Sequence, residues 1–130
     1  MVRQDDLAAK LFVESREQVA ICDPYIGLIV ESGEKQVGAF ILNDYTPGQN
    51  IEMSAVITGA VSMRDLRDIF RYCFARVRRV TARTSVKNTR TVYMLGVLGF
   101  KREGLLREWF RDGSDGVLFG LLKNEQRIFH

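Results

Sequence analysis

The feature that most constrains the fold of this sequence is an amphipathic stripe between residues 63 and 77. Apolar residues recur along it at helical spacing, at Met63, Leu66, Ile69, Phe70, Cys73, Phe74 and Val77. This spacing places them on one face of an α-helix, and such a face has to be buried against another element. Ser62, followed by Asp65 three residues later, is typical of a capping box that starts a helix. We therefore predict a helix over 63–76 that packs on a sheet.

Segments with strand character lie on both sides of this helix. Apolar runs bounded by turn residues predict strands at 25–31, 36–42, 51–57, 77–85, 103–110 and 117–122. Two further helices are predicted, one over 5–19 with Leu7, Leu11 and Phe12 on its apolar side, and one over 89–98. This order of elements indicates an α/β domain with a mixed sheet.

The whole chain, 1–130, is expected to form one domain. With 130 residues and 46% apolar content it can bury a core of its own. It contains no run of about 18 apolar residues, and its first six residues are too polar to begin a secretory signal. We therefore expect a cytoplasmic protein without a membrane segment.

Cysteine and histidine usage excludes several kinds of site. Cys22 and Cys73 are isolated, which favours reduced, buried thiols over a disulfide or a metal framework. The single histidine, His130, is the last residue, so neither a histidine-based catalytic triad nor a histidine zinc site is expected. No metal site is predicted.

The most specific local pattern runs from Asn88 to Glu108. Asn88 opens a short helix, Thr91 follows within its first turn, and Gly99-Phe100 and Glu103-Gly104 come after the helix. This pattern resembles the last third of the GNAT superfamily of acyl-CoA-dependent N-acyltransferases. The nearest relatives look like the branch that acetylates ribosomal-protein N-termini, together with small phage and bacterial members.

The resemblance implies a mixed, mostly antiparallel central sheet flanked by helices, with a V-shaped split between the strands at 51–57 and 78–85. It also implies that acetyl-CoA binds in this split and that its acyl group moves to a primary amine. The branch suggests a peptide or protein N-terminus as the acceptor. The N-terminal part is short for the family, with the usual first strand and second helix absent or reduced to a few residues.

Charge is distributed unevenly along the chain. Residues 1–63 contain four Lys+Arg and nine Asp+Glu, whereas residues 64–130 contain fifteen and seven. The basic half favours an anionic partner, either the phosphates of coenzyme A or nucleic acid, or it is simply a solvated basic face. Nucleic acid is the poorer choice, because no aromatic residue for base stacking lies between Phe74 and Tyr93.

Several residues are implied as contacts for acetyl-CoA. They are Ala55, Val56 and Ile57 for the pantetheine arm, Thr58, Gly59, Ala60 and Arg64 for the diphosphate, and Asn88 and Thr91 at the last helix. Free N–H groups at a helix N-terminus bind anions, but the loop at 58–60 matches the glycine pattern of the family poorly. A plain capped turn is the alternative for this loop, a simple N-cap for Asn88, and a surface position for Thr91.

Glu52 is the candidate general base. The resemblance places it at the acid of the "E-I-G-Y" strand, where partial burial would raise its pKa toward neutrality and let it accept the amine proton. A solvent-facing strand glutamate is the alternative. Many family members protonate the leaving thiolate with a tyrosine; Leu95 replaces it here, and Tyr93 lies on another side of the helix.

The other family positions have structural interpretations. Gly99 is expected to end the helix, with Phe100 filling the core beneath it. Trp109, Phe110 and Asp112 are interpreted as hairpin packing, with a wall of the acceptor site as the alternative. The missing tyrosine leaves a second function open, a catalytically impaired GNAT-fold module that binds CoA or another protein. We also consider a homodimer.

Overall fold

The computed structural model describes residues 1–17, 21 and 23–129. Val19, at the end of the predicted first helix, lies outside the described residues, as do Cys22 and His130. Within the described residues, no helix is long and apolar enough to cross a membrane.

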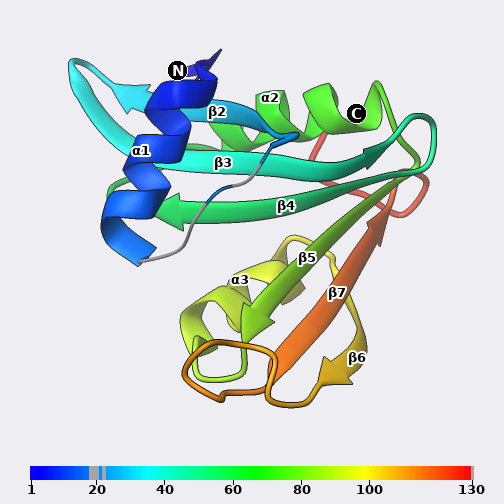
Figure 1. Ribbon diagram of the computed structural model, residues 1–130. Helices are drawn as coiled ribbons and strands as arrows, with labels where there is room; N and C mark the ends of the chain where they lie inside the picture. Colours follow the sequence, from blue (N-terminus) through cyan, green and yellow to red (C-terminus); the bar gives the residue numbers. More distant parts are fainter. Residues whose placement is uncertain (18–20, 22, 130) are drawn as a thin grey trace.

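A seven-stranded sheet lies at the centre of the molecule, in the order β1-β2-β3-β4-β5-β7-β6 (Figure 1). Its strands are β1 (Val2–Gln4), β2 (Ile26–Ser32), β3 (Lys35–Thr46), β4 (Asn50–Ile57), β5 (Arg79–Ser85), β6 (Lys101–Leu106) and β7 (Gly116–Leu122). Neighbouring strands are antiparallel except β4 and β5, which are parallel. The predicted mixed, mostly antiparallel sheet is confirmed, and β1 is the first strand reduced to a few residues.

Helices cover both faces of this sheet (Figure 1). α1 (Asp6–Glu17) packs on one face over β2 and β3, while α2 (Met63–Phe74) and α3 (Thr89–Val97) contribute to the core on the other face. The two cores are separate, and the larger one lies beneath α2. The candidate functional site lies on the sheet face that α1 covers.

The predicted apolar side of the first helix is wrong in part. Leu7 and Leu11 are 63% and 57% exposed, and the buried stripe consists of Ala9, Phe12 and Val13. The reason is a close approach to β2: a Cβ added at Gly27 would lie 2.6 Å from Cβ of Ala9. Because two small residues meet at this point, the helix turns Ala9 to the sheet, and the leucines face outward.

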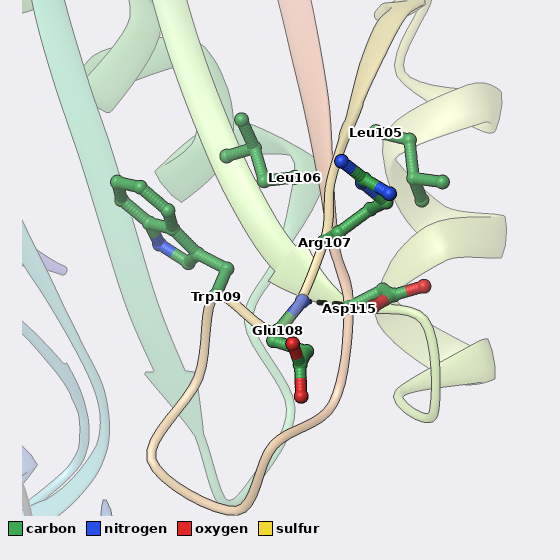
Figure 2. A pocket seen from close by; sticks show the side chains of 6 residues that line it. All are labelled: Leu105, Leu106, Arg107, Glu108, Trp109 and Asp115. Carbon is green, nitrogen blue, oxygen red and sulfur yellow. Dashed lines mark hydrogen bonds between the residues drawn. The ribbon is translucent and has the colours of Figure 1, made fainter.

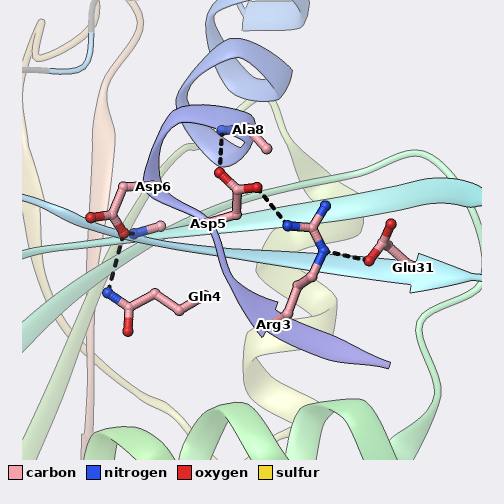
Figure 3. A network of polar contacts seen from close by, with 7 residues as sticks. Arg3, Gln4, Asp5, Asp6, Ala8 and Glu31 are labelled. Atoms are coloured by element: carbon pink, nitrogen blue, oxygen red, sulfur yellow. Dashed lines mark hydrogen bonds and ion pairs between the residues drawn. The ribbon is translucent and has the colours of Figure 1, made fainter.

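Polar contacts attach β1 and the start of α1 to the sheet (Figure 3). Arg3 lies between two carboxylates, with Nε 2.6 Å from Oε1 of Glu31 and Nη1 2.5 Å from Oδ2 of Asp5. Asp5 also accepts a hydrogen bond from the Ala8 N–H, and Asp6 accepts one from the Gly27 N–H. The short N-terminal part is thus tied to β2 by side chains as well as by strand pairing.

α2 has the predicted start and the predicted buried face. Ser62 is the N-cap and forms a capping box with Asp65. Leu66, Ile69, Phe70, Cys73 and Phe74 are buried beneath the helix, although Met63 in its first turn is exposed. Burial raises the pKa of the Cys73 thiol to about 12, which keeps it protonated and unreactive. The prediction of a buried, reduced thiol is confirmed for Cys73.

The end of α3 confirms the structural interpretation of Gly99 and Phe100. Gly99 has a φ of 97° and follows the C-cap Leu98, and the Phe100 N–H donates to the Leu95 carbonyl, which is a Schellman motif. The Phe100 ring packs edge-on against Phe70, with 6.0 Å between centroids. Only a residue that tolerates positive φ can turn the chain into the core at this point.

Candidate functional site

The parallel strands β4 and β5 separate partway along their length (Figure 1). Their pairing runs from Asn50 and Arg79 to Met53 and Ala82 and stops there, while β4 stays paired with β3 as far as Ile57. Ile51 and Met53 are buried, but Ala55 and Ile57 on the same face are exposed because the split removes their neighbour. The edge of β4 over 54–57 that faces β5 is therefore open.

The loop after β4 is held against β3. The N–H groups of Thr58 and Gly59 both donate to the Val37 carbonyl, at 2.9 and 3.1 Å. A Cβ on Gly59 would lie 2.8 Å from Cγ1 of Val37, so glycine is needed here for packing. These two N–H groups are not available to an anion. The next donors along the chain are the N–H groups of Ala60, Val61, Met63 and Arg64, which have no acceptor within the described part of the chain.

Asn88 is the N-cap of α3, and its side chain accepts a hydrogen bond from the Thr91 N–H at 3.3 Å. The capping interpretation of Asn88 is confirmed. Asn88 is exposed, and Thr91 is half-buried. Because β4 and β5 are parallel, the segments that follow them, 58–64 and 88–91, lie at the same open end of the split. The residues implied for CoA binding are thus brought to one end of the sheet.

Glu52 lies just before the point where the strands part, on the sheet face that α1 covers further along. Its strand neighbours are Asn43 on β3 and Thr81 on β5, and only 12% of its side chain is exposed. The pKa of Glu52 is raised to about 7, chiefly by burial and also by its hydrogen bond with the Asp44 carboxyl group, whereas the charge of Arg83 opposes the rise. The solvent-facing alternative for Glu52 does not hold.

Arg83 is the first residue of β5 beyond the last pair with β4. Its Nε lies 2.7 Å from Oε1 of Glu52, yet the N–H is not aligned for a hydrogen bond, so the contact is an ion pair. The guanidinium also lies 4.9 Å from the centroid of the Trp109 ring. Glu52, Arg83 and Trp109 therefore form one cluster at the vertex of the split.

A bulge in β3 brings a second carboxylate to this cluster. The β3–β4 register shifts between Asn43 and Thr46, and Asp44 has a φ of 46°. Aspartate adopts this left-handed conformation more easily than most residues, and the bulge turns its side chain to Glu52. Sequence reasoning missed Asn43, Asp44 and Arg83 as members of the site. No local signal marks the bulge, and Arg83 is one arginine among many in the basic half.

Trp109 also borders an open pocket of about 600 Å³ beyond β6, lined by Leu105, Leu106, Arg107, Glu108, Trp109 and Asp115 (Figure 2). Glu52 and Arg83 do not line this pocket, so the pocket is not part of the candidate site. A Cβ on Gly116 would lie 3.2 Å from Cβ of Trp109, so the ring packs closely on β7 as well. Asp112 accepts hydrogen bonds from Ser114 within the hairpin turn.

The remaining residues considered around α3 and β6 provide no additional candidate for a catalytic group. Leu95 packs against the large core, and Tyr93 is 73% exposed on a different side of the helix. Glu103 forms an ion pair with Arg79, with Oε1 2.5 Å from Nη2. Among the described residues, no group of three His, Cys, Asp or Glu side chains is placed to hold a metal ion.

No protein-family model matches the sequence, and no curated protein matches it either. Solved structures do match. Mutant forms of the spermidine/spermine N-acetyltransferase SpeG from Vibrio cholerae align with a TM-score of 0.80 at 14% identity, over 95% of each chain. A putative acetyltransferase aligns with a TM-score of 0.72 at 23% identity, over 80% of this chain and 62% of the other.

RimJ from Mycobacterium smegmatis, solved with CoA-disulfide, aligns with a TM-score of 0.69 at 21% identity. The alignment covers 92% of this chain and 60% of RimJ. At such identities the likeness concerns the fold. The chain has the fold of the GNAT N-acetyltransferases, including the split between two parallel strands.

Proposed function

We propose that this protein transfers an acetyl or other acyl group from acyl-CoA to a primary amine by direct attack. The observation that carries the proposal is Glu52, a largely buried acid with a pKa of about 7 at the vertex of the split. A base with this pKa is matched to proton removal from an amine near neutral pH. Bound acetyl-CoA supplies the activated thioester carbonyl.

The proposed reaction moves the acyl group directly from sulfur to nitrogen. Glu52 takes one proton from the acceptor ammonium, directly or through water, so that the neutral amine attacks the carbonyl carbon. As the C–N bond forms, the nitrogen releases its second proton to water, the C–S bond breaks, and the electron pair leaves on sulfur. Leu95 and Tyr93 offer no acid at the family's position. A thiol has an ordinary pKa of about 8.5, so a thiolate leaves without a protein acid.

The groups proposed to hold acyl-CoA surround the open end of the split. The pantetheine arm would lie along Ala55, Val56 and Ile57, where β4 is unpaired toward β5. The diphosphate would meet the N–H groups of Ala60, Val61, Met63 and Arg64 and the Arg64 side chain, while Thr58 and Gly59 shape the loop. Asn88 and Thr91 would contact CoA from the start of α3.

For the acceptor, the resemblance to the ribosomal-protein branch favours a peptide or protein N-terminus, and a RimJ structure is among the fold relatives. We further propose a cytoplasmic protein that acts as a homodimer; a spermidine N-acetyltransferase from Vibrio cholerae is dodecameric. A second candidate is a CoA-binding or protein-interaction module with impaired catalysis. It is favoured by the absent tyrosine and by the use of the Thr58 and Gly59 N–H groups within the fold.

A turnover assay tests this proposal. The protein is incubated with acetyl-CoA and a panel of primary amines, and both free thiol and acetylated amine are measured. We expect one acetylated amine for each thiol released, above the rate without protein. Tight binding of acetyl-CoA without any product, across peptides, amino acids and polyamines, would favour the second candidate.

A further inference from the structure

The polar groups around Glu52 are arranged with opposite character on the two sides of the split. On the β3–β4 side lie oxygen atoms, from Asn43, Asp44 and Glu52. On the β5 side lies the guanidinium of Arg83. A molecule at the vertex therefore meets hydrogen-bond acceptors on one side and a cation on the other.

Asn43 adds an acceptor that no described residue uses. Its Oδ1 is buried and receives no hydrogen bond from any described residue. Asn43 and Glu52 are directly paired across β3 and β4, so their side chains share one face of the sheet. Buried acceptors are normally satisfied, and an ammonium group carries three donors. The pair is suited to hold the amine that is to be acylated.

Arg83 keeps part of its binding capacity free. Its Nε faces Glu52, and 32% of its side chain is exposed. No hydrogen bond from its Nη1 or Nη2 is present in the described part of the chain. The Trp109 ring lies beside the guanidinium, with its centroid 4.9 Å away. A guanidinium held in this way presents its planar donors to a carboxylate or a carbonyl oxygen.

We propose, on the basis of the function proposed above, that Arg83 determines acceptor specificity by selecting α-amino groups. The acceptor ammonium would bind Asn43 and Glu52, while an oxygen on the carbon next to the amine-bearing carbon would bind Arg83. The source of that oxygen is either the carboxylate of a free amino acid or the first carbonyl of a peptide.

The short distance between Arg83 and Glu52 favours an acceptor with an oxygen on the carbon next to its amine-bearing carbon. Because these groups are 2.7 Å apart, the amine and the oxygen of the acceptor also have to be close together. A lysine side chain or an alkylamine has no oxygen at this spacing. A polyamine would bring further positive charge near Arg83, and like charges repel. These acceptors are therefore selected against.

The test compares kcat/KM for four acceptors in the wild-type protein and in Arg83→Gln. The acceptors are glycine, a glycyl dipeptide, ethylamine and spermidine. We expect the variant to lose about 10- to 100-fold for glycine or the dipeptide relative to ethylamine, as for a charge-assisted hydrogen bond. Each comparison is the ratio of kcat/KM for two acceptors, and the same two acceptors are used with both proteins. Differences in basicity between the amines therefore affect both ratios equally. Whichever of glycine and the dipeptide reacts faster identifies the source of the oxygen.

Arg83→Lys keeps the charge without the planar fork and should recover only part of the selectivity. Arg78→Gln, an exposed arginine just before the other end of β5, should leave the ratios unchanged. The proposal is overturned if Arg83→Gln leaves the ratios unchanged, or if ethylamine or spermidine is the best acceptor of the wild-type protein.

A binding measurement separates this proposal from the question of turnover. Glycine and the dipeptide are titrated into the protein saturated with CoA, and amide chemical shifts are followed by NMR. We expect saturable shifts at 43–44, 52 and 83, and at least tenfold weaker binding in Arg83→Gln, even if no acetyl transfer occurs. Equal affinity in both proteins, or no shifts at these residues, contradicts the assignment of Arg83.

Discussion

Replacing Glu52 with glutamine is expected to lower kcat for acetyl transfer by about 100- to 10,000-fold, the usual contribution of a positioned general base. Glutamine has nearly the same shape as the protonated acid but cannot accept the proton. The fold should be retained, because the raised pKa of Glu52 shows that its site favours the neutral form. Glu34→Gln, at an exposed residue in the β2–β3 turn, is the matched control.

The pH dependence of kcat in the wild-type protein is an independent test of Glu52 as the general base. A base works only when deprotonated, so kcat should fall about tenfold per pH unit below a pKa near 7. Stopped assays between pH 5 and pH 9 measure this limb. The inflection near pH 7 should be absent from the residual activity of Glu52→Gln, which should follow only the ionisation of the acceptor amine. Unchanged turnover in Glu52→Gln would remove Glu52 from the mechanism.

Truncating Phe70 to alanine is expected to lower the free energy of unfolding by about 3–5 kcal/mol, the typical loss for a buried phenylalanine. Phe70 is fully buried on α2, where it packs against Phe74 and Phe100. Its ring therefore joins the helix after the split to the segment that follows α3. Urea unfolding monitored by circular dichroism measures the change.

Tyr93→Ala is the control for Phe70, because Tyr93 is an aromatic residue on the surface of α3. Its unfolding free energy should change by no more than about 0.5 kcal/mol. A loss below about 1 kcal/mol for Phe70→Ala would mean that α2 does not pack on the sheet as described.

The elements of the fold were predictable where one local pattern determines them. The stripe on α2, the capping box at Ser62 and the turn at Gly99 each follow from local rules, and each is present. The orientation of α1 was not predictable, because it depends on the contact between Ala9 and Gly27, which are distant in sequence. Leu7 and Leu11 have helical spacing but do not face the sheet.

The candidate site was predictable to a lesser degree. The resemblance singles out Glu52, and the structure places this residue, with 12% of its side chain exposed, where β4 and β5 part. Its partners could not be identified, because a bulge places Asp44 and the end of strand pairing places Arg83. Both features arise from the register between strands, which depends on pairing across the sheet.

NMR mapping of acetyl-CoA shows whether the ligand binds in the split between β4 and β5. At millimolar ligand, a micromolar binder should stabilise the protein by about 4 kcal/mol and be saturated. We expect amide shifts to change at 54–64 and 88–91 and to stay constant at β1 and β2 on the far side of the sheet. Absence of any change at millimolar acetyl-CoA, or changes confined to the pocket at 105–109, would contradict the account.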